Sequence, residues 1–402
     1  MAQNKDLAEN ENNILNVGLV GHIDHGKTTL LQRLSGKWAD THSEELKRGI
    51  TIKLGYADAI IYYDEREGYN ISGKGKKIRE LSFIDAPGHE MLMATMLSGA
   101  ALIDVALLVI AANEGIKPQT REHLVALQVK GIKHLIVIQN KIDLVDGKRA
   151  RENYDEIRDF LKGKYDDAII IPVSAQQGVN IDLIWKSLCE IPIHKRDKSG
   201  DPYFLIARSF DINRPGTEPR ELHGAVLGGA LKRGVLKVGD EIEIKPGRVV
   251  KEANKYRFET ITTRVINLFR GSKKVPALTP GGSMSIETEL DMGLGKNDAL
   301  AGNVVSIKGK LPELTQQIKL KYKLFNEVFG INEKITVGPI KLSEVLLLSI
   351  NTSTTGGAVS HLRDDELDIS LKVPIVTFKG DNAGIARNIQ GHWRLIGHGR
   401  II

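Results

Sequence analysis

A glycine-rich stretch near the amino terminus contains the residue types that bind phosphate. From Gly21 to Thr28 it follows the pattern Gly-x-x-x-x-Gly-Lys-Thr, directly after an apolar run and before a helical pattern. Glycines let the backbone curl so that several N–H groups point at phosphate oxygens, and the start of a helix favours negative charge. We expect Lys27 to reach the β- and γ-phosphates and the Thr28 hydroxyl to bind Mg²⁺. The stretch therefore predicts binding of a nucleoside triphosphate.

The nucleotide contacts of this loop are expected at Asp24, His25, Gly26, Lys27, Thr28 and Thr29. Asp24 and Thr28 are also candidate Mg²⁺ ligands. His22 and His25 are interpreted as structural histidines rather than metal ligands. A pattern of four fixed positions arises by chance in roughly a few per cent of Gly-rich chains of this length, so the loop needs support from other residues.

A second group of residues, Asp85 to His89, follows another apolar run. A carboxylate at Asp85 can hold Mg²⁺ through water. The Gly88 N–H can sense a γ-phosphate, because only glycine lets the backbone approach so closely. His89 then lies where a histidine orients an attacking water, and it is the candidate catalytic residue, with a structural role as the alternative.

Thr51 lies between these two groups, within residues 48–52. A hydroxyl at this position can complete the Mg²⁺ shell when a nucleoside triphosphate is bound and be released on hydrolysis. As a bare pattern it is unremarkable, but in a protein that hydrolyses a nucleoside triphosphate it is the expected first switch.

A third group, at the end of a later apolar run, reads the base. The Asp143 carboxylate can accept two hydrogen bonds from N1 and N2 of guanine, a donor pair that adenine lacks. Asn140 can bridge the base edge and the phosphate loop, and the Lys141 stem can cover the ring. Further base contacts are expected after the next apolar run, at Ser174, Ala175 and Gln176. The order of these groups predicts a GTPase.

The elements that must position these residues alternate through the first half of the chain. Strands are predicted at 14–20, 81–84, 105–111, 135–139 and 169–173, and helices from the phosphate loop to about 34 and at 119–129, 149–161 and 181–188. Strands that are apolar throughout are typical of a parallel sheet covered on both faces. The pattern predicts a doubly wound α/β domain with ligands at the carboxyl ends of its strands.

The second half of the chain has a different pattern. Short β-like runs between glycines are predicted at 204–210, 225–227, 241–244, 284–287, 304–307, 319–324, 345–350, 366–371 and 375–378. Such runs favour β-barrels or sandwiches. We therefore predict a flexible N-terminus (1–13), a GTP-binding domain (14–190), a linker (191–202) and two β-barrel domains (203–310 and 311–402).

Composition excludes several classes of protein. The chain has 402 residues, of which 41% are hydrophobic and 26% charged, so two or three soluble domains are expected. Its one cysteine, Cys189, cannot form an internal disulfide, which fits a reduced, cytoplasmic compartment. The longest apolar run, 100–112, is shorter than the ~20 residues of a membrane span. The formal charge of +6 fits either simple solubility or a polyanionic partner such as RNA.

Residues 21–30, 48–52 and 85–89 together resemble the translational GTPases of the elongation factor Tu class. That class has an α/β GTPase domain followed by two β-barrels. Within it, the chain resembles the gamma-subunit family of archaeal and eukaryotic translation initiation factor 2. Residues 42–49, 53–56, 88–97, 208–217 and 391–397 carry this likeness, which extends over about 14–402.

The chain departs from many members of that family in one stretch. Those members carry four cysteines that form a zinc knuckle, whereas residues 61–80 here contain none. No thiolate zinc site is therefore expected. The stretch has Tyr62, Tyr63, Tyr69 and a basic run at 74–77 instead. Either it folds without metal or it stays partly disordered until a partner binds, and the basic run is either a solvated loop or an RNA contact.

The resemblance implies a function. The GTP-bound protein would carry methionylated initiator tRNA to the small ribosomal subunit, as the core of a heterotrimer with alpha and beta subunits, and hydrolysis at the start codon would release it. Arg208, Arg214, Arg220, Arg233, Arg387, His392, Trp393 and Arg394 are weighed as tRNA contacts against ordinary barrel surface and core.

Other functions of the same class remain open. The chain could be an elongation-type or selenocysteine-specific aminoacyl-tRNA carrier. It could also be the GTPase subunit of a sulfate-activating enzyme, or an assembly module that binds GTP and hardly hydrolyses it.

Overall fold

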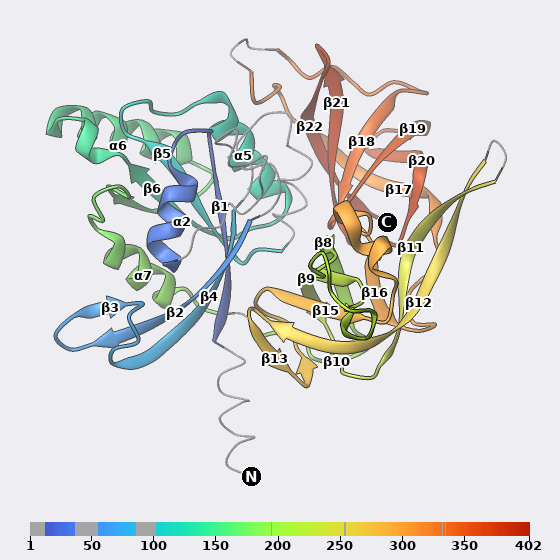
Figure 1. Cartoon of the computed structure of the whole chain (residues 1–402). Helices are drawn as coiled ribbons and strands as arrows, with labels where there is room; N and C mark the ends of the chain where they lie inside the picture. Colours follow the sequence, from blue (N-terminus) through green and yellow to red (C-terminus); the bar gives the residue numbers. More distant parts are fainter. Residues whose placement is uncertain are drawn as a thin grey trace. The chain divides into compact units, whose positions relative to one another are not determined.

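The computed structural model describes residues 13–36, 55–85, 102–193, 195–252, 255–331, 333 and 335–402, with the side chains of 252, 255 and 256 left out. The chain divides into two compact units. One contains residues 1–194, 326–337 and 392–395, and the other contains 195–325, 338–391 and 396–402. Figure 1 shows the α/β elements in blue to green and the all-β elements in yellow-green to red.

The first unit is built on a seven-stranded sheet of order β3-β2-β4-β1-β5-β6-β7. Strands β4, β1, β5, β6 and β7 are parallel, whereas β2 pairs antiparallel with both β4 and β3. Its strands are β1 (Ile14–Gly21), β2 (Gly55–Asp64), β3 (Gly68–Asn70), β4 (Lys76–Asp85), β5 (Val105–Ala111), β6 (His134–Asn140) and β7 (Ile169–Pro172). The predicted parallel sheet is confirmed.

Helices cover both faces of the sheet (Figure 1). They are α2 (Lys27–Ser35), α5 (Pro118–Val129), α6 (Gly147–Leu161) and α7 (Ile181–Glu190). Leucines and isoleucines of α2 and α7 share one core with alternate residues of the strands, among them Val17, Phe83 and Leu107. On the opposite face of β6, the Gln139 side chain bonds to the α6 carbonyl of Ala150. The sheet is therefore buried on both sides, as its continuous apolar strands require.

The cysteine-free stretch 61–80 is an ordered part of this sheet. Strand β2 continues into it, β3 follows, and β4 begins at Lys76, so the stretch forms an antiparallel meander. The buried side chain of Asn70 organises the turn: its amide donates to Gly68 O and Lys74 O at 3.2 Å, and its oxygen accepts from the Ser72 N–H at 3.1 Å. The stretch is therefore ordered as part of the sheet, and the absence of zinc stays a prediction.

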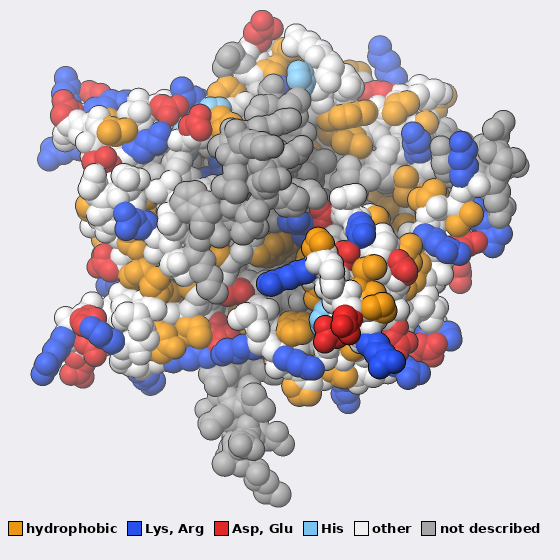
Figure 2. Space-filling model, in the orientation of Figure 1, with side chains coloured by type: hydrophobic (Ala, Val, Ile, Leu, Met, Phe, Trp, Pro, Cys, Tyr) orange, Lys and Arg blue, Asp and Glu red, His pale blue; other side chains and the backbone are white. Residues whose placement is uncertain are grey.

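The basic run of this meander is paired with acidic side chains. Lys74 lies 2.5 Å from Glu67, and Lys77 contacts Glu80. These pairs favour the interpretation as a solvated turn. On the face drawn in Figure 2, blue and red side chains are similarly interspersed over the described surface.

A barrel follows in the second unit. Its sheet has the order β11-β16-β8-β9-β15-β12-β13, and pairing of β11 with β12 closes six of these strands into a ring. The strands are β8 (Tyr203–Phe210), β9 (Val226–Arg233), β11 (Glu241–Glu252), β12 (Lys255–Arg270), β13 (Lys273–Val275), β15 (Met284–Thr288) and β16 (Val304–Ile307), with β10 (Leu236–Lys237) and β14 (Ala277–Leu278) forming a separate pair. Inward-facing residues such as Phe204, Ile244 and Ile286 fill it.

The last sheet is a closed barrel of order β17-β20-β19-β18-β21-β22. Its strands are β17 (Thr315–Leu324), β18 (Val345–Ile350), β19 (Ser353–Arg363), β20 (Glu366–Ile375), β21 (Asn382–Ile389) and β22 (His392–Ile401). The predicted strand at 375–378 is wrong, because β20 ends at Ile375 and irregular chain follows. In the ranges that the structure describes, no helix combines the length and apolarity needed to span a membrane.

Candidate nucleotide-binding site

The phosphate loop connects β1 to α2 at the carboxyl edge of the sheet. Gly26 is the N-cap of α2, with φ of 89°, and as a glycine it makes no side-chain capping hydrogen bond at the helix start, where an anion is favoured. Gly21 has φ of 141°, and a Cβ there would lie 2.4 Å from the carbonyl oxygen of Val109. Only glycine fits at either position, and the loop keeps the shape that an anion requires.

Lys27 provides the positive charge of the loop. Its side chain is buried, and its ammonium donates to Gly21 O at 3.0 Å and to His22 O at 2.8 Å. Burial lowers the pKa of Lys27, while Asp85 and Asp24 oppose that shift. The two carbonyls hold the charge within the loop.

Two of the predicted Mg²⁺ ligands lie together. The Thr28 hydroxyl donates to Asp85 Oδ2 at 3.1 Å, which joins the start of α2 to the end of β4. Oxygen ligands of this kind suit Mg²⁺, which keeps several waters and takes the rest of its shell from phosphate. Asp24 is exposed, with φ of 61°. Among the described residues no cluster of three or more His, Cys, Asp or Glu side chains could hold a metal.

Asn140 joins three loops. Its side-chain amide donates to the His25 carbonyl at 2.9 Å, and its oxygen accepts from the Ala175 N–H at 3.0 Å. A Cβ on Gly26 would lie 2.4 Å from the Asn140 amide nitrogen, so Asn140 packs directly on the phosphate loop. This residue, at the end of β6, fixes the predicted base-binding loops against the phosphate loop.

The residues after Asn140 turn outward. Lys141 adopts the left-handed conformation, with φ of 60°, and its ammonium lies 3.5 Å from Glu114. A short 3₁₀ turn, Ile142–Leu144, then presents Asp143 at the surface with its side chain exposed. An exposed carboxylate beside a lysine stem is compatible with reading the edge of a base.

The loop after β7 is attached to α2 by a residue that sequence analysis did not identify. Arg33 donates to Ala175 O at 2.9 Å and to Gln176 O at 2.6 Å. Ser174 is buried, and its hydroxyl accepts from the Gln177 N–H at 3.1 Å. Arginine is common on helices, so nothing in the pattern around Arg33 distinguishes it.

Three histidines surround the phosphate loop. His25 is fully buried and its Nδ1 donates to Val109 O at 3.2 Å, because a carbonyl can only accept. Burial lowers the pKa of His25 to about 3, so the ring is neutral and its 3.8 Å approach to Glu114 is not an ion pair. His22 meets it edge-on at 5.1 Å. This packing supports the interpretation of His22 and His25 as structural. The third, His123 of α5, is buried and was not predicted.

Thr51, Gly88 and His89 lie outside the described residues, so their roles stay predictions. Thr29 lies half-buried in the first turn of α2. The rest of the predicted nucleotide contacts gather in the loops after β1, β4, β6 and β7.

The arginines weighed as tRNA contacts fall into two groups. Arg208 lies 2.9 Å from Asp298, Arg387 pairs with Glu344, and Arg394, which is buried, lies 3.6 Å from Glu122 within the first unit. Arg233 stacks over the Phe378 ring at 4.8 Å. Arg214 and Arg220 are exposed. Internal contacts thus account for most of this set.

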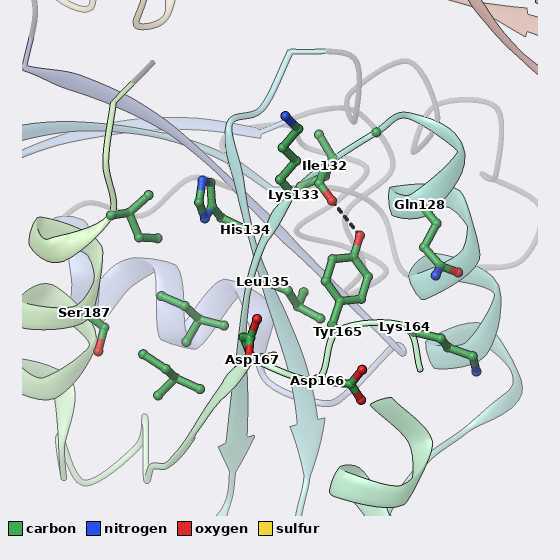
Figure 3. Close-up of a pocket in the computed structure, with 15 residues that line it drawn as sticks. Gln128, Ile132, Lys133, His134, Leu135, Lys164, Tyr165, Asp166, Asp167 and Ser187 are labelled. Carbon is green, nitrogen blue, oxygen red and sulfur yellow. Dashed lines mark hydrogen bonds between the residues drawn. The ribbon is translucent and has the colours of Figure 1, made fainter. Parts of the chain in front are cut away.

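A separate cavity of about 870 Å³ lies near the amino end of β6, away from the carboxyl ends of the strands (Figure 3). His134 and Leu135 line it together with Tyr165, whose hydroxyl donates to the carbonyl of Ile132 at 2.7 Å. Because the phosphate loop and Asn140 lie at the carboxyl ends of the strands, this cavity is not part of the candidate nucleotide site.

Two family models match the chain. Residues 12–194 match the elongation factor Tu GTP binding domain, and residues 316–401 match the C-terminal model of initiation factor eIF2 gamma.

Curated proteins named translation initiation factor 2 subunit gamma match nearly the whole length. The one from Methanococcus vannielii is 48% identical over 410 residues, covering 98% of this chain and 100% of the relative. The one from Pyrococcus horikoshii is 50% identical over 398 residues, covering 96% of this chain and 97% of the relative.

Among solved structures, a bacterial selenocysteine-specific elongation factor superposes with a TM-score of 0.75 at 24% identity. The match covers 96% of this chain, which spans 58% of that protein. SelB from Methanococcus maripaludis, in complex with the GTP analogue GPPNHP, has a TM-score of 0.73 at 21% identity, covering 97% of this chain and 79% of that one. At these identities the likeness shows a shared fold alone.

Proposed function

Because the chain belongs to the gamma-subunit family of translation initiation factor 2, we propose that it delivers methionylated initiator tRNA to the small ribosomal subunit while GTP is bound. The chain is a translation initiation factor and a GTP hydrolase of the translational class. The proposal adds the cargo, the destination and the residues that carry the nucleotide.

The double hydrogen bond of Asn140 carries the proposal that the nucleotide is a guanine nucleotide held at this edge of the sheet. These bonds bring the phosphate loop at His25 together with the loop at Ala175, and Asn140 lies three residues before Asp143. The Asp143 carboxylate then accepts from N1 and N2 of guanine. Because the Ala175 N–H donates to Asn140, the donor to O6 is a neighbouring backbone N–H of residues 174–176. ATP lacks the donor pair that Asp143 needs.

Each residue of the phosphate loop has one task. Lys27 and the uncapped N–H groups of α2 bind the β- and γ-phosphates. Thr28 would ligate Mg²⁺ and Asp85, which accepts from the Thr28 hydroxyl, would hold it through water, with Asp24 as a further candidate ligand. Bound Mg²⁺ neutralises charge on the phosphates during transfer to water.

The switch residues complete the mechanism. Thr51 and the Gly88 N–H respond to the γ-phosphate, and His89 orients the attacking water. Apolar Ile23 and Ile50 keep His89 away from that water until a trigger arrives, which makes intrinsic hydrolysis slow. Loss of the γ-phosphate frees both switches, and the tRNA is released.

The proposed partners follow from the family. They are the alpha and beta subunits of the same factor, initiator methionyl-tRNA and the small ribosomal subunit, all met in the cytoplasm. We retain 14–190, 203–310 and 311–402 as the proposed domains, and we expect no zinc in the meander.

Filter binding tests this function. The purified heterotrimer is titrated with labelled initiator methionyl-tRNA in the presence of GTP, GDP or no nucleotide, and elongator methionyl-tRNA is the control. We expect tight binding of the initiator species with GTP only. Equal binding of the two tRNAs, or binding that ignores the nucleotide, would refute the proposal.

A further inference from the structure

The backbone of Gly21 is contacted by two side chains, one on each of the peptide groups that flank its Cα. Its N–H donates to Nδ1 of His123 at 2.9 Å, and its carbonyl accepts from the ammonium of Lys27 at 3.0 Å. His123 lies on α5, which covers the sheet beside β1 and β5 (Figure 1). One backbone unit thus connects a helix outside the loop to the charge that binds phosphate.

The chemistry of this contact fixes the state of the imidazole. A backbone N–H can only donate, so Nδ1 of His123 must be unprotonated and the ring proton lies on Nε2. His123 is 2% exposed. Burial lowers its pKa to about 3, and the charge of Lys27 acts in the same direction. The acceptor is therefore present throughout the neutral range.

Gly21 has no side chain that could help to fix its backbone. It pairs with Val109 of β5, and a Cβ at this position would lie 2.4 Å from the Val109 carbonyl oxygen. The residue is buried between β5 and α5. Beside this strand pairing, His123 supplies the side-chain contact to the Gly21 N–H.

We propose that His123 is a positioning residue for phosphate binding. By fixing the N–H side of Gly21, it limits the movement of the Gly21 Cα and so helps to keep in place the following carbonyl, which accepts from the Lys27 ammonium. The inference rests on the proposed nucleotide site and extends it, since no motif includes His123. Without the acceptor, a buried N–H loses its partner, the backbone at Gly21 can shift, and the carbonyl that accepts from Lys27 is held less firmly.

Two substitutions of similar polarity separate this role from simple packing. In His123→Asn the side-chain oxygen takes the place of Nδ1, because both atoms are bonded to Cγ. In His123→Gln the polar atoms move one bond further out, to the place of Nε2. His123→Ala removes the acceptor altogether. The readouts are the dissociation rates of fluorescent GDP and GTP and the unfolding midpoint of each nucleotide-free variant.

We expect His123→Asn to release nucleotide within about twofold of the wild-type rate and the Gln and Ala variants about tenfold faster, the size of effect given by one lost buried hydrogen bond. Wild-type rates in the Gln and Ala variants, or an Asn variant as impaired as Gln, would overturn the proposal. Failure of the wild-type protein to bind guanine nucleotide would instead refute the nucleotide site itself.

A spectroscopic measurement does not depend on nucleotide or on how the variants fold. Nitrogen NMR of the wild-type protein labelled at histidine should show Nδ1 of His123 as a non-protonated ring nitrogen at pH 7. A protonated Nδ1 would contradict the hydrogen bond from Gly21 and the proposal with it.

Discussion

The side-chain amide of Asn140 donates to the backbone carbonyl of His25 across 2.9 Å, and both residues are buried. The two belong to loops that are far apart in the chain, one after β1 and the other after β6. The same amide group also accepts from Ala175. A single side chain therefore determines how the phosphate loop and the base-binding loops face each other.

Replacing Asn140 with Ala should weaken the binding of GTP and of GDP to a similar extent. The change leaves the His25 carbonyl and the Ala175 N–H without this partner, and a buried group left unpaired costs about 1–3 kcal/mol. We expect at least a tenfold rise in the Kd of both nucleotides, measured by equilibrium titration with fluorescent analogues. Gln177→Ala, an exposed change in the neighbouring loop, is the control. Unchanged affinity in the Asn140 variant would contradict the bridging role.

Replacing Asp143 with Asn should change the base that is bound. Asparagine offers one acceptor and one donor, which match N1–H and O2 of xanthine, whereas guanine presents two donors to the carboxylate. Because Asp143 is exposed, the fold should be unaffected. We expect GTP affinity to fall by about two orders of magnitude and XTP affinity to rise, since discrimination of this kind depends on unpaired polar groups. Competition titrations with GTP and XTP measure this change in base preference. A variant that still prefers GTP would exclude Asp143 as the residue that recognises the base.

Part of this site could be predicted from the sequence because its residues follow apolar strands directly. Strand β5 was predicted at its observed bounds, Val105–Ala111, since all its residues are apolar. Parallel strands place their carboxyl ends at one edge, so Lys27, Asp85 and Asn140 had to meet.

Other contacts could not be predicted, because they depend on tertiary packing. Arg33 and His123 lie on helices without a motif, and only the packing of α2 and α5 shows what they touch. Strand β2 was missed because it is only half-buried and pairs at an antiparallel edge. Strand β12, Lys255–Arg270, was missed because polar residues alternate along it.

Replacing His89 with Ala should separate binding from turnover. If His89 orients the attacking water, its loss leaves the phosphate loop intact and the Kd for GTP unchanged. Stimulated hydrolysis on the ribosome should fall by about two to four orders of magnitude, the usual contribution of a general acid–base residue. A single-turnover assay of phosphate release checks this. Full residual turnover would leave His89 with a structural role only.

Replacing Asn70 with Ala should loosen the meander, whereas a metal chelator should not. The Asn70 amide joins Gly68, Lys74 and Ser72, and its loss removes several partly buried hydrogen bonds. Each such bond contributes about 0.5–1.5 kcal/mol, so faster amide exchange is expected across residues 68–76. Ser72→Ala, which removes only one hydroxyl contact with Asn70, is the matched control. Faster amide exchange in this stretch after EDTA treatment of the wild-type protein would instead indicate that a metal organises the turn.

The stability of the nucleotide-free protein should depend on pH through His123. Its pKa falls from an ordinary 6.5 to about 3 in the folded state, chiefly through burial. Below pH 6.5 the imidazole of His123 therefore binds a proton in the unfolded chain but not in the folded one. Its contribution to the free energy of unfolding is fully present above pH 6.5 and is lost as the pH falls toward 3. One such proton corresponds to a slope of about 1.4 kcal/mol per pH unit.

His123→Asn isolates that slope, because asparagine keeps the acceptor for Gly21 but has no proton to take up. Urea unfolding at pH 7, 6, 5 and 4.5 should give free energies that match at pH 7 and then diverge, with the wild-type protein losing stability faster. His25, whose pKa is also lowered, contributes equally to both proteins and cancels in the difference. Parallel curves would mean that His123 is protonated in the folded state, and a protonated ring cannot accept from the Gly21 N–H.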